Sequence, residues 1–400
     1  MSRPACEVAD VFRRYGGAFQ NQYGQLMQPL HRLVLKSLAA CRTAQLGGHV
    51  LQCDHCGHQK QAYNSCHNRH CPKCQASLRA QWFEDRQRDL LPVEYFHVVF
   101  TLPDELGPLA LQDKAVIYNL LFKATAETLL QAAADWKDLK AKIGFFAILH
   151  TWGQKLDLHP HLHCVVPGGG VSLDGQRWVN CPSGFFMPVK LLGRMFRGKF
   201  LRLLKDAYRR EQLTLAGRLQ PLRPSAAFHS WLTPLYRKDW VVYAKPPWKG
   251  PDYALKYLAR YTHRVAIANS RIQSIDNGQV TFRYKDYRHG HRGRTLTLAA
   301  TEFIRRFMMH LLPNGFVRIR YYGFLANTHR QQQLRKIRQL LSVPQPASSG
   351  NETEDEQQAS ASPDHDQRCP HCNEGFLWPI DMAPRPRLSE ILNLPLLVPT

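Results

Sequence analysis

Residues 158–163 read LHPHLH, a stretch in which histidines occupy alternate positions. In an extended strand, side chains two residues apart point to the same face, with their Cα atoms ~6.6 Å apart. His161 and His163 would therefore share one face, while Leu162 between them would point into a core. Pro160 is tolerated only near a strand end or at a sheet edge, so His161 and His163 form the more regular pair. Two imidazoles at this separation can bind one divalent ion.

A third metal ligand is expected close to this pair. The candidates are His159, which shares the face if the strand extends that far, and Gln154. Paired imidazoles by themselves favour zinc or another transition metal, because magnesium prefers oxygen ligands. The alternative is a histidine-rich surface strand that binds no metal.

The sequence around the histidines consists of strand-sized apolar runs and helical segments. Residues 94–102 (EYFHVVFTL) and 143–152 (IGFFAILHTW) have the length and composition of buried strands. Residues 114–133 have the period of an amphipathic helix, and residues 188–212 predict a basic helix or helix pair. This alternation predicts a mixed body of helices and strands over about residues 93–340.

A cysteine-rich module precedes this body. Five of the eleven cysteines fall between positions 53 and 74, which indicates metal binding in a reducing cytoplasm rather than disulfides. A CxxC turn supplies two thiolates, and two such turns close a tetrahedral zinc site. The simplest four-ligand set is the two CxxC pairs, Cys53, Cys56, Cys71 and Cys74. The residues that can substitute, or hold a second ion, are Cys66, His67 and His70.

A further CxxC pair lies near the end of the chain. It follows residues 343–367, whose Pro, Ser, Gln and acidic content predicts a disordered linker. The pair, Cys369 and Cys372, is half a zinc site. His365 and His371, or a partner chain, could complete it, and a vestigial knuckle is the alternative.

A tyrosine-rich segment follows the body's predicted strands. Residues 252–264 (DYALKYLARYTHR) carry Tyr253, Tyr257 and Tyr261 at four-residue spacing, on one face of a helix. Such a stripe is more often part of a core. A tyrosine can also attack a phosphodiester where a metal and nearby cations neutralise the developing charge. The nearby cations are Lys256, Arg260 and Arg264.

The chain is strongly basic. Lys and Arg number 53 against 31 Asp and Glu, a formal net charge of +22, which indicates a polyanionic partner such as nucleic acid. Residues 276–278 (DNG) predict a hairpin turn. The segment that follows, residues 282–294 (FRYKDYRHGHRGR), interleaves aromatic and basic side chains.

Three of these segments together resemble the two-tyrosine HUH transposases of bacterial rolling-circle insertion sequences. The zinc module comes first, His161-Leu162-His163 then supplies the histidine–hydrophobic–histidine motif, and YLARYTHR carries Tyr257 and Tyr261. The resemblance spans most of residues 45–330.

The resemblance implies a mechanism of metal-dependent single-strand DNA cleavage and joining. His161 and His163, with a third polar ligand, would hold Mg²⁺ or Mn²⁺ against the scissile phosphate, while zinc is structural. Tyr257 or Tyr261 would attack and leave a 5′-phosphotyrosine and a free 3′-hydroxyl. The second tyrosine would serve a second cleavage or the strand transfer.

The resemblance also implies the fold class, α+β. It predicts an HUH endonuclease-type antiparallel sheet with flanking helices, preceded by a small zinc-binding module and followed by a disordered tail. The expected parts are a helical segment with the zinc module (1–90), a catalytic domain (91–340), a disordered linker (341–367) and a tail with half a knuckle (368–400).

DNA is the expected partner, chiefly single-stranded element ends and target DNA in the bacterial nucleoid. Arg283, Lys285 and Arg288 would hold a single strand by charge, with stacking on neighbouring tyrosines; a solvated hairpin face is the alternative. No apolar stretch reaches the ~20 residues of a membrane helix. The competing functions are an HUH replication initiator or relaxase, a non-catalytic zinc-finger DNA-binding protein, and a zinc hydrolase with Asp157 as its base.

Overall fold

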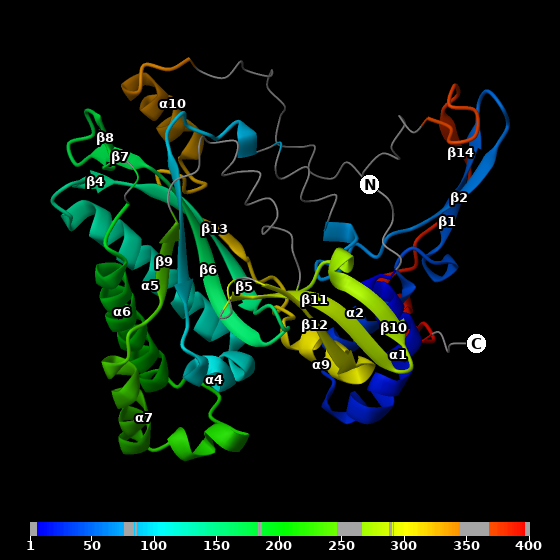
Figure 1. The fold of residues 1–400 in the computed structure, drawn as a ribbon, viewed down its shortest axis with the longest axis horizontal. Coiled ribbons are helices and arrows are strands. Elements are labelled where there is room, and N and C mark those ends of the chain that lie inside the picture. Colours follow the sequence, from blue (N-terminus) through cyan, green and yellow to red (C-terminus); the bar gives the residue numbers. More distant parts are fainter. Residues whose placement is uncertain are drawn as a thin grey trace. The chain divides into compact units, whose positions relative to one another are not determined.

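The chain folds into two units, each assembled from segments far apart in the sequence (Figure 1). The computed structural model describes residues 6–75, 84, 86–182, 184, 186–245, 266–287, 290, 292–344 and 368–396. The first unit consists of Met1–Ser77, Ile267–Met308 and Ala347–Thr400, and the second of Leu78–Ala266 and Met309–Pro346. This division differs from the expected parts, because residues 267–308 and the C-terminal segment belong to the unit that contains the zinc module.

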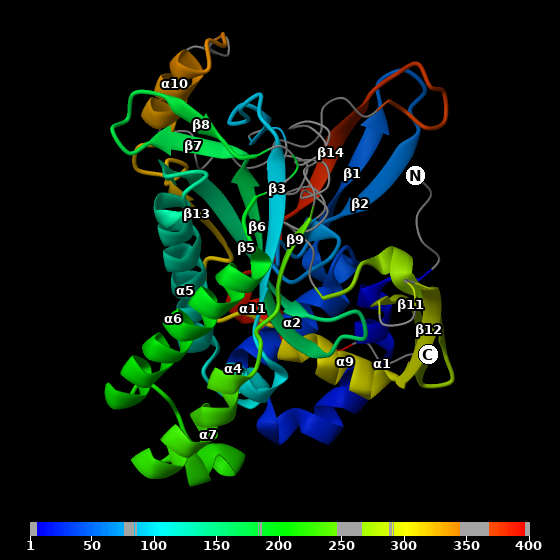
Figure 2. The same cartoon turned by 60° about the vertical axis from the view of Figure 1, so that its left-hand side comes forward.

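A five-stranded antiparallel sheet forms the centre of the second unit (Figure 2). Its strands, in order across the sheet, are β13 (Ile319–Gly323), β5 (Gly144–Trp152), β6 (Leu158–Pro167), β3 (Tyr95–Thr101) and β9 (Val242–Lys245). Strand β6 is central and is hydrogen-bonded to β5 on one side and to β3 on the other. The three predicted strands, the antiparallel sheet and the α+β class are therefore confirmed.

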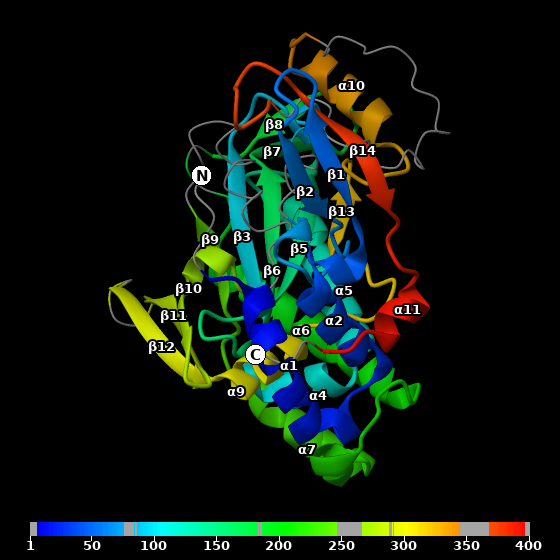
Figure 3. The ribbon, with the colours of Figure 1, turned by 90° about the vertical axis from the view of Figure 1, so that its right-hand side faces the viewer.

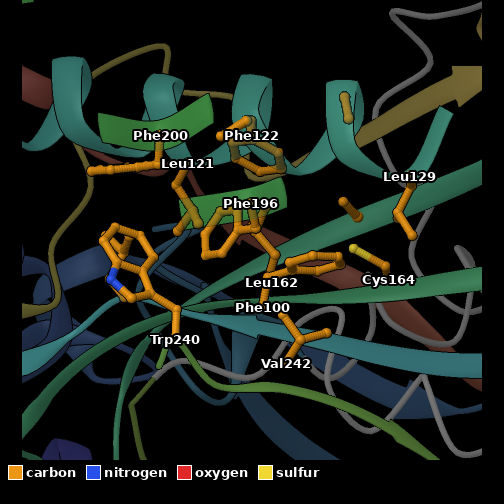
Figure 4. Packing of buried hydrophobic residues seen from close by; sticks show 14 of the residues in the cluster. Phe100, Leu121, Phe122, Leu129, Leu162, Cys164, Phe196, Phe200, Trp240 and Val242 are labelled. Carbon is orange, nitrogen blue, oxygen red and sulfur yellow. The ribbon is translucent and has the colours of Figure 1, made fainter. Parts of the chain in front are cut away.

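Two long helices cover one face of this sheet. Helices α5 (Lys114–Asp135) and α6 (Val189–Arg209) pack on it through a large apolar core that includes Leu162 (Figure 4). The ring of Phe196 lies 5.1 Å from that of Phe100 and 5.3 Å from that of Trp240, measured between centroids. Strand β6 thus buries every second side chain against helices, which directs the intervening ones to the opposite face.

The opposite face has a smaller apolar cluster towards one end. Ile148 of β5 and Val165 of β6 pack there with Leu334 and Ile337, which come from α10 (Arg330–Leu340). Among the described residues, the other α-helices and strands of this unit are α4 (Gly107–Gln112), β4 (Ala141–Lys142), β7 (Gly169–Ser172), β8 (Trp178–Asn180) and α7 (Ser225–Arg237).

The first unit combines helices with two three-stranded sheets of order β14-β1-β2 and β10-β11-β12 (Figure 3). Its strands are β1 (Gly48–Cys53), β2 (Gln59–Tyr63), β10 (Ile272–Asp276), β11 (Gln279–Asp286), β12 (Arg292–Ala299) and β14 (Leu377–Ala383). The α-helices in the described part of this unit are α1 (Val8–Tyr23), α2 (Pro29–Ala40), α9 (Ala300–Met309) and α11 (Leu388–Asn393).

The sequence predicts the β10–β11 turn correctly. Asp276 pairs with Gln279, and the two residues between them, Asn277 and Gly278, have φ angles of 48° and 74°. Positive φ at both positions is the geometry for which Asn-Gly is selected in two-residue hairpins.

The C-terminal segment, expected to be a tail, contains a strand and a helix, β14 and α11. Strand β14 pairs with β1, so residues after the predicted linker complete a sheet that begins near the N-terminus. Residues 345–367, most of that linker, lie outside the described residues. The tyrosine segment 252–264 lies outside them as well.

The helix-facing core predicts a large effect of truncation at Phe196. We expect Phe196→Ala to lower the free energy of unfolding by ~3–5 kcal/mol, because its ring is fully buried and a cavity would remain. Urea denaturation would measure this change. The control is Val241→Ala, since that side chain is 64% exposed; equal midpoints for the two variants would contradict the assignment of this core.

Candidate metal centres

Three histidines converge on the face of the sheet opposite α5 and α6. His161 and His163 lie on β6, and His150 lies on the neighbouring strand β5, where it pairs directly with His161. The Nε2 atoms of His161 and His163 are 3.1 Å apart, and Nδ1 of His150 is 3.1 Å from Nε2 of His163. Each of the three rings offers one nitrogen, and these three nitrogens all lie within 4.8 Å of one another.

The second ring nitrogens of the β6 pair have partners of their own. His161 donates a hydrogen bond from Nδ1 to the backbone carbonyl oxygen of His159, at 2.6 Å. Nδ1 of His163 lies 2.7 Å from Nε2 of His97, which is buried on β3. An imidazole that donates from Nδ1 carries its lone pair on Nε2. His161 therefore has Nε2 available for a metal, and His163 has it in the tautomer that donates from Nδ1 to His97; each ligand has a supporting contact behind it.

Burial keeps these imidazoles neutral. It lowers the pKa of His161 to about 4, and burial together with the neighbouring imidazoles lowers the pKa of His163 well below its usual value. Burial likewise lowers the pKa of His97 to about 3. A neutral imidazole is the form that binds a metal. The donor set fits one divalent ion held by three nitrogens, with open positions for oxygen ligands.

The third member of the group differs from the two candidates that the sequence suggests. His159 is outside the group, and its Nδ1 lies 3.9 Å from a carboxylate oxygen of Asp104. Gln154 lies in the turn between β5 and β6, and its role as a metal ligand stays a prediction. The signal for His150 in the sequence is its position near the end of the predicted strand 143–152; the structure pairs this strand antiparallel with the LHPHLH strand.

The five clustered cysteines divide between two sites, so the simplest expected set is wrong. Cys53 and Cys56 do not share a site with Cys71 and Cys74. The first site consists of Cys41, Cys66, Cys71 and Cys74. The second consists of Cys53, Cys56, Cys369 and Cys372. His67 and His70 are not in either group of described residues, nor does His371 join Cys369.

The first cysteine site has the dimensions of a zinc centre. Sγ of Cys74 is 3.8 Å from that of Cys41 and 3.6 Å from that of Cys66, and the Sγ atoms of Cys71 and Cys41 are 3.7 Å apart. With Zn–S bonds of ~2.3 Å, the sulfurs of a tetrahedral site are ~3.8 Å apart. Cys41 follows α2 without a CxxC partner, which is why sequence spacing alone does not reveal it.

The predicted DNA contacts fall partly on described residues. Arg283 and Lys285 lie on β11 with exposed side chains. The backbone carbonyl oxygen of Arg283 accepts a hydrogen bond of 2.7 Å from Nε of Arg271. The predicted residues outside the described part of the chain are Tyr257, Tyr261, Lys256, Arg260, Arg264 and Arg288.

Similarity to known proteins assigns the chain to a family. It is 51% identical over 385 residues to "Putative transposase y4qJ" of Sinorhizobium fredii (strain NBRC 101917 / NGR234), covering 96% of each chain. It is 30% identical over 316 residues to "Transposase for insertion sequence element IS801" of Pseudomonas savastanoi pv. phaseolicola, covering 77% of this chain and 73% of that one. The chain belongs to the IS91/IS801 family of transposases.

Two family models match separate parts of this transposase. "Transposase zinc-binding domain" matches residues 11–102, which include all ligands of the first cysteine site. "Putative transposase" matches residues 144–333, which include the three histidines. Cys369 and Cys372 lie outside both matches.

Among solved structures, the conjugative relaxase TrwC in complex with mutant oriT DNA aligns with 62% of the transposase and 74% of its own chain, at 15% identity. The TM-score is 0.23, which supports no conclusion about fold or function.

None of the described helices is long and apolar enough to cross a membrane.

The contact between His97 and His163 predicts a supporting role for His97 in metal binding. We expect His97→Phe to weaken Mn²⁺ binding by ~10–100-fold, because His163 loses the group that orients its ring. His97→Gln, which keeps an acceptor, should weaken it less. Isothermal titration calorimetry measures both.

The control for this substitution is His229→Phe, an exposed histidine on α7. Affinity unchanged in His97→Phe would show that the His97 contact does not support the ligand.

Proposed function

We propose that this transposase cleaves and joins single-stranded DNA through a tyrosine nucleophile beside a metal held by His150, His161 and His163. The observation that carries the proposal is the convergence of three imidazoles on one point, with the second ring nitrogens of His161 and His163 held by other groups. A purely structural histidine cluster does not require ligand atoms directed at one point. Membership of the transposase family supplies the reaction class.

The metal would neutralise charge on the scissile phosphate, which makes the phosphorus more open to attack. Imidazole ligands suit a transition ion such as Mn²⁺, while oxygen from phosphate and water would be needed to make Mg²⁺ a good fit. The choice of Mn²⁺ or Mg²⁺ therefore depends on oxygen ligands from the phosphate and water as well as on the histidines.

The tyrosines provide the covalent step. The phenolic oxygen of Tyr257 or Tyr261 gives up its proton and forms a bond to phosphorus, the bond from phosphorus to the 3′-oxygen breaks, and the leaving 3′-oxygen takes up one proton, so protons balance. The products are a 5′-phosphotyrosine and a free 3′-hydroxyl. Attack by a 3′-hydroxyl reverses these changes and rejoins DNA without a nucleotide cofactor, while the second tyrosine cleaves or transfers another strand.

The β11–β12 hairpin is proposed to contact DNA. Arg283 and Lys285 are exposed on β11. On β12, the exposed Arg292 and Arg294 pair with Asp286 and Tyr284, the β11 residues next to them. Exposed cations placed along one hairpin match the phosphates of a single strand.

Covalent adduct formation tests the catalytic proposal. Purified protein with Mn²⁺ and labelled single-stranded DNA from the element's own end should give an adduct on a denaturing gel. The Tyr257→Phe/Tyr261→Phe double variant and His161→Ala should give none, because the nucleophile or a metal ligand is missing. The single tyrosine variants show which tyrosine makes the first cleavage and which one serves the second cleavage or strand transfer.

The same gel distinguishes the third ligand. His150→Ala should abolish the adduct, and Gln154→Ala should retain it. If wild-type protein binds this DNA but forms no adduct with either Mn²⁺ or Mg²⁺, the protein acts as a non-catalytic DNA-binding protein and the proposal fails.

The hairpin makes a separate prediction about DNA affinity. We expect Arg283→Ala/Lys285→Ala to weaken single-stranded DNA binding and to reduce the slope of log K against log salt by ~0.7 for each phosphate that is no longer neutralised. Fluorescence anisotropy over a salt series measures this slope. Lys238→Ala is the control, because that ammonium pairs with Glu105. A slope equal to that of wild type would exclude these two residues as phosphate ligands.

A further inference from the structure

Four cysteines from opposite ends of the chain lie together in the first unit. Sγ of Cys53 is 3.7 Å from that of Cys372, and Sγ of Cys56 is 3.7 Å from that of Cys369. All four sulfurs lie within 4.8 Å of one another, and none is in a disulfide. These separations match the ~3.8 Å edge of a zinc–thiolate tetrahedron. They also match the distances in the first cysteine site.

Each CxxC turn is shaped to hold thiolates. The backbone N–H of Cys56 donates to Sγ of Cys53 at 3.5 Å. In the other turn, the N–H of His371 donates to Sγ of Cys369, and that of Gly375 donates to Sγ of Cys372, both at 3.4 Å. Backbone donors aimed at sulfur stabilise the charged form that binds a metal. Two such turns facing each other make a complete ligand set.

The strands that carry these turns are joined as well. Cys53 of β1 pairs with Leu377 of β14, and the pairing continues along β1 to Gly48. Asp54 accepts hydrogen bonds from the backbone N–H of Phe376 at 2.8 Å and from Nε1 of Trp378 at 3.1 Å.

The apolar core beneath this site is small. Its buried members are Leu51, Cys53, Cys369 and Leu377, so half of them are ligands themselves. A three-stranded sheet with so little apolar area does not hold by burial alone, and small modules of this kind are stabilised by a metal.

The segment after β14 extends the connection to the rest of the first unit. Nη2 of Arg385 donates to the carbonyl oxygen of Cys66, a member of the first cysteine site, at 2.7 Å. Ile391 of α11 is fully buried, and Lys36 of α2 donates to the carbonyl oxygen of Leu392. The C-terminal segment therefore contacts both cysteine sites.

We propose that Cys53, Cys56, Cys369 and Cys372 bind a second structural Zn²⁺ that joins the two ends of the chain. The zinc-binding domain is thus incomplete without the C-terminal segment, although the family match to that domain ends at residue 102. The proposal is independent of the catalytic mechanism, because none of these residues belongs to the histidine site.

Zinc content of the full-length protein tests this assignment. The count is made in a His150→Ala/His161→Ala/His163→Ala background, because those imidazoles can also bind zinc, and this parent protein should contain two zinc ions per chain by elemental analysis; the cysteine substitutions are made in the same background. Cys369→Ser/Cys372→Ser and Cys53→Ser/Cys56→Ser should each contain one, and the quadruple variant should also contain one, because the two pairs share an ion. Cys6→Ser, outside both sites, is the control and should keep two. Retention of two ions by Cys369→Ser/Cys372→Ser would overturn the proposal.

Alkylation of the unmodified protein tests it without any substitution. In the zinc-loaded chain, all four cysteines should resist N-ethylmaleimide, including the exposed Cys56, and all four should become reactive together after chelation. Cys6 serves as the internal reference for an unligated thiol. Reaction of Cys56 and Cys372 before chelation at a rate similar to that of Cys6 would contradict a shared zinc ion.

Discussion

Strand β6 is hydrogen-bonded along both edges, and this two-sided pairing organises the second unit. A strand bonded on both sides cannot rotate, so its alternate side chains are fixed to opposite faces. The burial of Leu162 beneath α5 and α6 sets which face is apolar. His161 and His163 must then point to the other face, where β5 supplies His150 and β3 supplies His97. Packing on one side of the sheet thereby positions the metal ligands on the other.

The first unit depends on a different constraint, the demand of zinc for four ligands in a tetrahedron. Each of its two cysteine groups combines a CxxC pair with at least one cysteine from a distant part of the sequence. One group takes Cys41 from the end of α2 and Cys66 from the loop before its pair. The other takes the C-terminal pair, with Cys56 and Cys369 separated by 313 positions. Strand β14 is held against β1 by the same arrangement.

Local patterns predicted the elements of the sheet and part of the site. Apolar runs and alternation identified β3, β5 and β6, and the Asn277-Gly278 pair identified the β10–β11 turn, because these signals depend on neighbouring residues only. His161 and His163 were found through their two-residue spacing. His150 was missed because its place beside His161 depends on the β5–β6 register, which no single segment encodes. The grouping of the cysteines was missed for the same reason.

The sequence by itself therefore determined the kinds of ligand, the strand that carries two histidines, the basic character of the chain and its resemblance to two-tyrosine transposases. Residue type and spacing carry that information locally. Only the tertiary structure decided that His150 joins the pair, that Cys41 completes one cysteine site, and that Cys369 and Cys372 complete the other. A metal site is defined by distances between atoms, and chain folding can set those distances between residues at any separation in the sequence.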